Sequence, residues 1–166
     1  MPDKQEAANK QRQTGKQDNG PLRLDRFIPY RLSVLTSRVT GRLAREYESV
    51  AGLQLPEARV LTVLGFFKPI SSNAIVQHTS MDKATVSRAV ARLIRLGLIT
   101  RKPDPTDRRL LVLGFTPRGQ RTYDRLTSRA RAWEAWFLAE LKPSERAGLE
   151  RILARLARRL DGATLG

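Results

Sequence analysis

Apolar residues recur every three or four positions along most of the chain after residue 27, which is the spacing of amphipathic helices. The first stripe predicts one long helix, and its members are Ile28, Leu32, Leu35, Val39, Leu43 and Tyr47. Pro29 suits the first turn of this helix, where no backbone donor is needed, and Gly52 follows its end. A second helix is predicted from Pro56 to about Leu64, with Gly65 behind it.

Two short helices are predicted next, almost back to back. Ser71 can cap the first, in which Ile75 and Val76 are expected to point inward. After a break of three residues, Asp82 can cap the second helix, which stops at Gly97. The residues that it is expected to bury are Val86, Val90, Leu93 and Ile94. Two helices joined by so short a turn indicate a helix-turn-helix motif.

A β-hairpin is predicted directly after this motif, because LITRK and RLLVLGF are strand-like and flank the turn PDPTDR. A helix-turn-helix followed by a two-stranded hairpin is a winged helix. Thr116 and Pro117 then supply the cap and first-turn proline of a further helix, with the face Tyr123, Leu126, Ala130, Trp133, Phe137 and Leu141. Pro143 opens a last helix with the stripe Leu149, Ile152, Leu153, Leu156 and Leu160. The predicted fold class is mainly α with a small β-hairpin wing.

Composition narrows the function. The chain of 166 residues carries 31 Lys and Arg against 16 Asp and Glu, a net charge of +15, which implies a polyanionic partner. It has no cysteine, which excludes disulfides, thiolate zinc sites and a thiol-based redox switch. A single histidine, His78, and the lack of a glycine-rich phosphate loop argue against an enzyme, a metal site or a cofactor. No apolar run is long enough to span a membrane and no secretory signal is visible, so the expected location is the cytoplasm.

The second helix of the motif is expected to contact DNA. Its exposed face comprises Lys83, Ala84, Thr85, Ser87, Arg88, Ala91, Arg92 and Arg95. Residues near the start of such a helix reach base edges in the major groove, so Arg88 is the best candidate for a bidentate contact with guanine. Thr85 and Ser87 suit a base or a phosphate, and Ala84 a thymine methyl group. The two arginines farther along are expected at phosphates. The alternative is a solvated basic helix face.

The predicted hairpin carries basic residues of its own. Asp104 and Asp107 favour the turn, while Arg108 and Arg109 are placed to enter or border the minor groove, whose negative potential attracts arginine. The alternative is that the aspartates only form the turn and the arginines only keep the hairpin soluble.

The order of elements from Phe27 to Leu160 resembles the MarR family of bacterial transcription regulators. The resemblance is carried by MDKATVSRAVARLIRLGLITRKPDPTDRR and LGFTPRG, which are similar to the family's recognition helix, wing and following helix start. It implies a homodimeric repressor that binds a palindromic operator on double-stranded DNA in the bacterial cytoplasm and is nucleoid-associated when bound.

The family's wing carries an Asp-x-Arg-Asp-x-Arg signature. Asp104, Asp107 and Arg109 match it, whereas Thr106 replaces the middle arginine. The resemblance implies that Asp107 orients Arg109 in the minor groove, and that Arg108 compensates for the arginine missing at 106. The first helix of the motif also departs from the family, with a valine at 76 and a threonine at 79 where Ala and Leu are common.

The terminal helices are expected to form the dimer, since apolar stripes outside the winged helix need a partner. The predicted interface residues are Leu141, Leu149, Ile152, Leu153, Leu156 and Leu160. The alternative is that these stripes pack on each other within one subunit. The predicted organisation is a disordered basic tail (1–21), the N-terminal helix of the dimerisation region (22–52), the winged helix-turn-helix domain (53–116) and the C-terminal dimerisation helices (117–166).

The resemblance also implies a small aromatic effector, which would be an aromatic acid, a phenol or an aryl-CoA thioester. The predicted ligand-binding residues are Phe27, Tyr30, Arg31, Phe66, Trp133 and Phe137, with Ser33, Phe67 and Trp136 beside them. The alternative is that these aromatic residues belong to the core or the dimer interface. Thiol-based peroxide sensing is excluded by the lack of cysteine.

The sequence therefore predicts a dimeric, sequence-specific DNA-binding regulator, and the family resemblance implies a repressor that a small aromatic effector relieves. The alternative is an architectural protein that coats DNA with little sequence preference, because neutralising phosphates suffices for non-specific binding. The two differ in their specificity ratio at a fixed salt concentration. An RNA or membrane partner is not favoured, since no exposed aromatic platform is apparent in the sequence.

Overall fold

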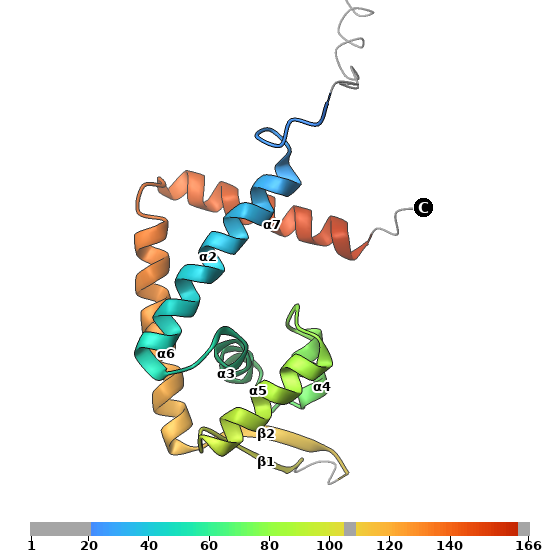
Figure 1. Ribbon diagram of the computed structural model, residues 1–166, viewed down its shortest axis with the longest axis vertical. Coiled ribbons are helices and arrows are strands. Elements are labelled where there is room, and N and C mark those ends of the chain that lie inside the picture. Colours follow the sequence, from blue (N-terminus) through green and yellow to red (C-terminus); the bar gives the residue numbers. More distant parts are fainter. Residues whose placement is uncertain (1–20, 105–108, 163–166) are drawn as a thin grey trace, which may run out of the picture. The chain divides into compact units, whose positions relative to one another are not determined.

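The computed structural model describes residues 21–104 and 109–162. In chain order the elements are α2 (Ile28–Ala51), α3 (Leu55–Phe67), α4 (Ser72–Gln77), α5 (Lys83–Arg95), β1 (Ile99–Pro103), β2 (Leu111–Phe115), α6 (Pro117–Phe137) and α7 (Pro143–Asp161) (Figure 1). This mainly helical chain with one hairpin confirms the predicted fold class. The chain consists of two compact units, Met1–Arg38 and Val39–Gly166, and the boundary between them falls within α2.

The described part of the first unit is a turn followed by the start of α2. The backbone N–H of Phe27 donates to the carbonyl of Arg23 at 2.9 Å, and the Arg23 guanidinium pairs with Asp25 at 2.9 Å. No residue of α2 is buried, so this part of the helix gains nothing from a core of its own.

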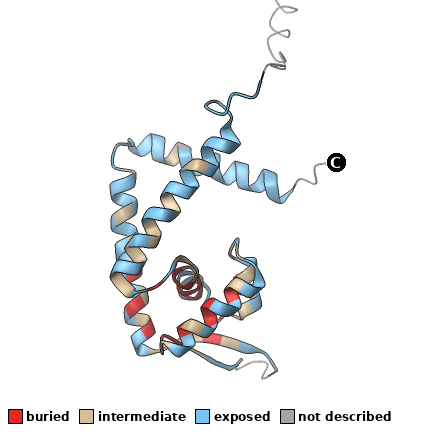
Figure 2. Ribbon diagram, viewed as in Figure 1, coloured by how far each residue is buried: buried red, intermediate tan, exposed pale blue. Residues whose placement is uncertain are grey.

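The second unit contains one apolar core, which the winged helix builds. It gathers buried residues from α3, α4, α5, the hairpin and the first half of α6. These are Leu53, Val60, Leu61, Leu64, Ile70, Ile75, Val86, Ala89, Val90, Leu93, Leu98, Ile99, Leu113 and Leu126. Figure 2 colours the ribbon red where residues are buried. Tyr47 near the end of α2 packs against this core, and burial raises the pKa of its hydroxyl while Arg59 acts in the opposite direction.

Local hydrogen bonds set most helix boundaries where the sequence predicted them. Ser71, Asp82 and Thr116 cap α4, α5 and α6, and each side chain accepts the backbone N–H three residues later at 2.8 to 3.2 Å. Gly52 and Gly97 end α2 and α5 with positive φ angles of 63° and 65°, a conformation that favours glycine. The three predicted caps are confirmed.

The two strands pair antiparallel, from Ile99 opposite Phe115 to Pro103 opposite Leu111. A single bridge joins Leu113 to Ile70, where the Leu113 N–H donates to the Ile70 carbonyl at 2.9 Å. The wing is therefore fixed to the segment that leads into α4. Both strands start later than predicted, at Ile99 and Leu111.

Helix α3 is longer than predicted, because it runs through Gly65 to Phe67 instead of stopping before this glycine. A Cβ atom at Gly65 would overlap the ring of Tyr123 on α6. This glycine therefore serves close packing inside a helix and does not end one.

Two further expectations about individual side chains are wrong. Ile94, predicted to be buried, is 38% exposed, while Ala89 is buried in its place. The buried positions of α5 follow the 86, 89, 90, 93 pattern of one helix face, and residue 94 lies about 100° beyond its last member. Leu141 does not extend the face of α6, since that helix ends at Phe137.

Helix α7 has no buried residue. Arg146 near its start lies 3.6 Å from Glu134 of α6 and 3.5 Å from Glu150 one turn on, which ties the two last helices together. No single helix in the described ranges is long and apolar enough to cross a membrane; only α2 and α3 taken together, bent by 80° at their junction, reach that length and composition.

Candidate nucleic-acid interface

Helix α5 has one face buried in the core and one basic face outside it. Val86, Ala89, Val90 and Leu93 are buried. The predicted DNA-contacting side chains share the other side of the helix, where they are exposed or half-exposed: Lys83, Ala84, Thr85, Ser87, Arg88, Ala91, Arg92 and Arg95. The core thus fixes which face of the helix a partner meets.

A chain of hydrogen bonds runs along the first turns of α5. The Thr85 hydroxyl donates to the Asp82 carboxylate at 2.8 Å, and the same oxygen accepts from Nη2 of Arg88 at 3.1 Å. The Thr85 backbone N–H donates to the other carboxylate oxygen at 2.8 Å, and this bond lowers the pKa of Asp82. Because a hydroxyl has one proton, the bond to Asp82 leaves a lone pair of Thr85 directed at Arg88. Arg88 is therefore oriented before any partner arrives.

Arg92 has an acidic neighbour that the sequence analysis missed. Its Nε atom lies 3.9 Å from Glu57 of α3, whose side chain is only 7% exposed. The other carboxylate oxygen of Glu57 accepts the backbone N–H of Gln54 at 2.8 Å and so caps α3. A cavity of about 480 Å³ lies between the start of α3 and α5, and Arg88, Arg92 and Arg95 all line it. The Arg92 guanidinium can therefore pair with Glu57 of α3 or with a DNA phosphate, and the two interactions compete.

The wing presents further basic side chains. Arg101 and Lys102 on β1 are exposed, and so is Arg109 just before β2. The backbone N–H of Asp104 donates to the Leu110 carbonyl at 2.8 Å, which closes the described part of the hairpin. Asp107 and Arg108 lie outside the described residues, so the pairing of Asp107 with Arg109 stays a prediction.

The start of α6 holds the end of the recognition helix in place. The Thr116 hydroxyl donates to the Gly97 carbonyl at 2.7 Å, and its backbone N–H donates to the Leu98 carbonyl at 3.1 Å. A Cβ atom at Gly119 would overlap that same Leu98 carbonyl. The segment after α5, the start of β1 and the first turn of α6 are therefore hydrogen-bonded and closely packed at this point.

Two of the six predicted ligand-binding residues meet in the structure. Trp133 stacks on Phe137 with ring centroids 4.9 Å apart, and Trp136 lies 6.2 Å from Trp133. Together with Arg42 and Glu46 of α2, the two tryptophans line a cavity of about 260 Å³. Arg129 forms an ion pair with Glu46 at its edge. Arg42 was not among the residues predicted to bind the ligand, because the sequence does not show that it lies beside Trp133.

Phe66, a third predicted ligand-binding residue, is not among the residues that line this cavity. Phe66 is 80% exposed and packs edge-on against Phe67, which stacks on the exposed His78 at 4.0 Å. This aromatic surface corrects the expectation that none is exposed. Phe27, just before α2, and Tyr30 and Arg31 in its first turn are exposed residues of the first unit. In the described part of the chain no three His, Asp or Glu side chains converge to hold a metal ion.

A helix-turn-helix with a basic second helix and an attached hairpin defines a winged-helix DNA-binding protein. The model of the MarR family matches residues 51–110, a range that contains α3, the helix-turn-helix and the first strand of the wing. The chain is 29% identical over 117 residues, 70% of each chain, to a putative transcriptional regulatory protein for the hcr operon of Thauera aromatica. It is 28% identical over 143 residues to the HTH-type transcriptional repressor Rv2887 of Mycobacterium tuberculosis, which covers 86% of this chain and 97% of that one. The chain belongs to the MarR family of transcriptional regulators.

Solved structures agree with this assignment. A MarR/EmrR family transcriptional regulator from Acinetobacter sp. ADP1 superposes with a TM-score of 0.79 at 25% identity, over 86% of this chain and 100% of that one. A probable transcriptional regulator from Pseudomonas aeruginosa is 32% identical, with a TM-score of 0.66, over 81% of this chain and 99% of that one. CouR from Rhodococcus jostii RHA1, solved bound to p-coumaroyl-CoA, shares the fold with a TM-score of 0.74 at 20% identity, over 88% of this chain and 99% of that one.

Proposed function

We propose that this regulator is a homodimeric repressor that binds a palindromic operator and is released by a small aromatic ligand. The observation that carries the DNA-binding half is the orientation of Arg88 by Thr85 and Asp82 on the exposed face of α5. A guanidinium held in one direction is suited to the two acceptors of guanine in the major groove.

The proposed contacts divide into two kinds. Lys83, Ala84, Thr85, Ser87 and Arg88 lie in the first turns of α5, the part of a recognition helix that reaches base edges. Arg92 and Arg95 in its last turn, with Arg109 and the predicted Asp107 and Arg108 of the wing, contact the backbone or the minor groove. Contacts of the second kind fix the position of the protein on the duplex without selecting bases.

The dimer is supported by the apolar stripe of α7. A single chain leaves this stripe open to solvent, with exposed fractions between 37% and 79% for Leu149, Ile152, Leu153, Leu156 and Leu160, and of 38% for Leu141 before the helix. So long a row of exposed leucines is costly in water and is stabilised when a second copy covers it. A two-fold pair would present two recognition helices about 34–36 Å apart, one turn of duplex, and so select a palindrome.

The repressor role is supported by the relative Rv2887, which is named a transcriptional repressor. A DNA-bound dimer that lies over a promoter blocks the polymerase without any further activity. A small molecule relieves it only if that molecule binds the non-DNA-binding conformation more tightly.

The ligand proposal rests on the cavity beside Trp133. Its aromatic wall and the guanidinium of Arg42 suit a ring with a carboxylate or phenolate group. At about 260 Å³ the cavity is slightly smaller than most small-molecule sites, which favours an aromatic acid or a phenol over an aryl-CoA thioester. CouR, which shares the fold, was solved with p-coumaroyl-CoA. Phe27, Tyr30, Arg31 and Phe66 do not line this cavity, and their predicted role as ligand-binding residues is kept as a separate part of the proposal.

The second candidate function is an architectural DNA-binding protein, favoured by the net charge of +15. One titration separates the two. The duplex upstream of the protein's own gene and a scrambled duplex of equal length are titrated at one physiological salt concentration, and the complex is footprinted. Symmetric protection with a preference of about 10³-fold or more supports the repressor. Equal affinity for genomic and scrambled duplexes supports the architectural function.

A further inference from the structure

Helix α6 carries a row of arginines outside the proposed DNA-binding face of α5 and the wing. Arg118, Arg121 and Arg125 are spaced by three and four residues, so they share one face of the helix. Such spacing sets like charges against each other, and Arg118 adds a cation to the first turn, where the helix dipole disfavours one. No acidic residue occupies that turn. The local sequence therefore opposes helix stability at these positions.

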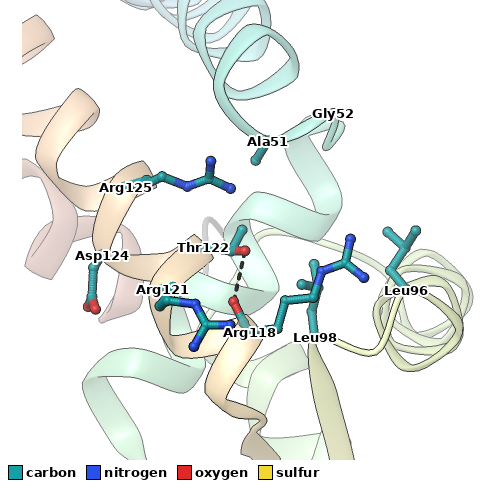
Figure 3. A pocket seen from close by; sticks show the side chains of 9 residues that line it. All are labelled: Ala51, Gly52, Leu96, Leu98, Arg118, Arg121, Thr122, Asp124 and Arg125. Atoms are coloured by element: carbon teal, nitrogen blue, oxygen red, sulfur yellow. Dashed lines mark hydrogen bonds between the residues drawn. The ribbon is translucent and has the colours of Figure 1, made fainter.

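No carboxylate compensates the row among the described residues, where none of the three guanidinium groups forms an ion pair. Asp124 is the acidic residue beside them in sequence. Its carboxylate accepts a hydrogen bond from the Gln120 amide at 2.9 Å, and Figure 3 shows its side chain pointing away from the arginines. Three positive charges thus remain without an acidic partner in the parts of the chain that the structure describes.

The row lines a cavity of about 730 Å³, the size of an ordinary small-molecule site. Ala51 and Gly52 at the end of α2 form one wall, and Leu96 and Leu98 after the recognition helix form another (Figure 3). No aromatic side chain lines it, so nothing in the cavity would stack on a ring. Asp124 also lines the cavity, so one carboxylate accompanies the three guanidinium groups. The net positive charge of the lining favours an anion.

The backbone of the site is rigid. The hydrogen bonds of Thr116 to Gly97 and Leu98 fix the first turn of α6, which carries Arg118, against the end of α5. The Thr122 hydroxyl, buried between the arginines, donates to the Arg118 carbonyl at 3.0 Å. A ligand held here would therefore contact the base of the recognition helix directly.

We propose that this cavity is a second ligand site, which binds a small molecule carrying two or more phosphate groups between Arg118, Arg121 and Arg125. Guanidinium groups bind phosphate oxygens with paired, charge-assisted hydrogen bonds. Three such groups match a ligand with several phosphates better than a ligand with a single phosphate. The site is separate from the aromatic cavity lined by Trp133 and Trp136, and it does not depend on the proposed repressor function.

The test is calorimetric titration of the full chain with inorganic tripolyphosphate at constant ionic strength. The variant Arg121→Gln/Arg125→Gln is compared with Arg151→Gln/Arg155→Gln, which removes the same charge from exposed positions of α7. The cavity variant should lose about tenfold or more in affinity, and the α7 control should stay within about twofold of the original chain. Equal losses in both variants, or no saturable binding to the original chain, would overturn the proposal.

Chemical-shift mapping gives a readout that needs no variant. Tripolyphosphate should move the amide signals of Gly52, Leu98 and Thr122, which surround the cavity. Shifts confined to Ser87, Arg88 and their neighbours would instead place the anion on the DNA-binding face. A third outcome is that a DNA duplex displaces tripolyphosphate and that the cavity variant loses as much affinity for DNA as for tripolyphosphate. That outcome would assign the three arginines to the DNA backbone and would also overturn the proposal.

Discussion

The Thr85 hydroxyl accepts a hydrogen bond from Nη2 of Arg88 at 3.1 Å, one turn along the recognition helix. The Thr85 hydroxyl donates its own proton to Asp82 at 2.8 Å, so it cannot donate to DNA unless this hydrogen bond to Asp82 breaks. The helix cap and the proposed base-reading residue are thus parts of one hydrogen-bonded chain. Base selection by Arg88 is expected to depend on a residue that need not touch DNA.

Replacing Arg88 should reduce both affinity and selectivity. Arg88→Ala is expected to cost about 1–3 kcal/mol of operator binding and to relax the preference at one position of each half-site. Binding to a panel of single-base operator variants measures this. Arg95→Ala is the matched control, and it should weaken all sequences alike and lower the salt dependence by about one phosphate contact. Uniform weakening by Arg88→Ala would assign that residue to a phosphate.

The variant Asp82→Asn isolates the positioning role. Asparagine is as good a helix cap as aspartate, so thermal stability at neutral pH should change little. Its amide nitrogen, however, would donate to the Thr85 hydroxyl and compete with Arg88 for the same oxygen. We expect operator selectivity at the Arg88 position to fall while non-specific affinity is retained, as the same operator panel would show.

Acid titration supplies an independent check on Asp82. Its pKa in the folded chain is lowered, chiefly by the Thr85 backbone N–H, so the ionised cap stabilises the fold above the unfolded-state pKa. That contribution is lost as the pH falls through the lowered value. Asp82→Asn should remove this part of the acid dependence. An unchanged acid-unfolding profile together with unchanged selectivity would contradict the role given to Asp82.

Local chemistry explains which parts of the fold the sequence could predict. The caps at Ser71, Asp82 and Thr116 are bonds between near neighbours, so their sequence patterns are sufficient. Gly65 has the sequence pattern of a helix end, but its role is fixed by the ring of Tyr123, 58 residues away in the chain. Only the packed structure shows that contact.

The same distinction applies to the candidate sites. The basic face of α5 follows from helical periodicity, whereas the approach of Glu57 to Arg92 depends on how α3 packs against α5. The spacing of Arg118, Arg121 and Arg125 is visible in the sequence. The cavity that these arginines line is not, because segments from three parts of the chain form it. Periodicity predicts a face; it does not predict what lies opposite.

Gly119 should be required for the close packing of the first turn of α6 against Leu98, just after the recognition helix. Gly119→Ala places a Cβ atom on the Leu98 carbonyl and is expected to destabilise the fold by about 1–3 kcal/mol or more. Gly41→Ala is the control, since no atom lies within 4 Å of its added Cβ, and it should stabilise α2 by about 0.5–1 kcal/mol. Urea denaturation of both variants measures the difference. Equal stabilities would show that the first turn of α6 can shift freely.

Arg109 is expected to act in the minor groove beside each half-site. Arg109→Ala should weaken binding most when the flanking sequence is an A·T tract, whose narrow groove has the strongest negative potential. Operators that differ only in their flanks provide the measurement. Arg101→Ala is the control, because this exposed arginine lies on β1, away from the turn. A loss that does not vary with the flanking sequence would remove Arg109 from the groove.

The exposed stripe of α7 makes the dimer testable with one change. Leu153 is 48% exposed in the single chain, so a charge there should leave the fold of the subunit intact but prevent a second copy from covering the stripe. Leu153→Asp is expected to sediment as a monomer and to lose about tenfold or more in operator affinity, because one half-site contact is no longer tied to the other. Arg155→Asp introduces the same acid on the same helix outside the apolar stripe and should remain dimeric. A dimeric Leu153→Asp variant would show that α7 lies outside the interface.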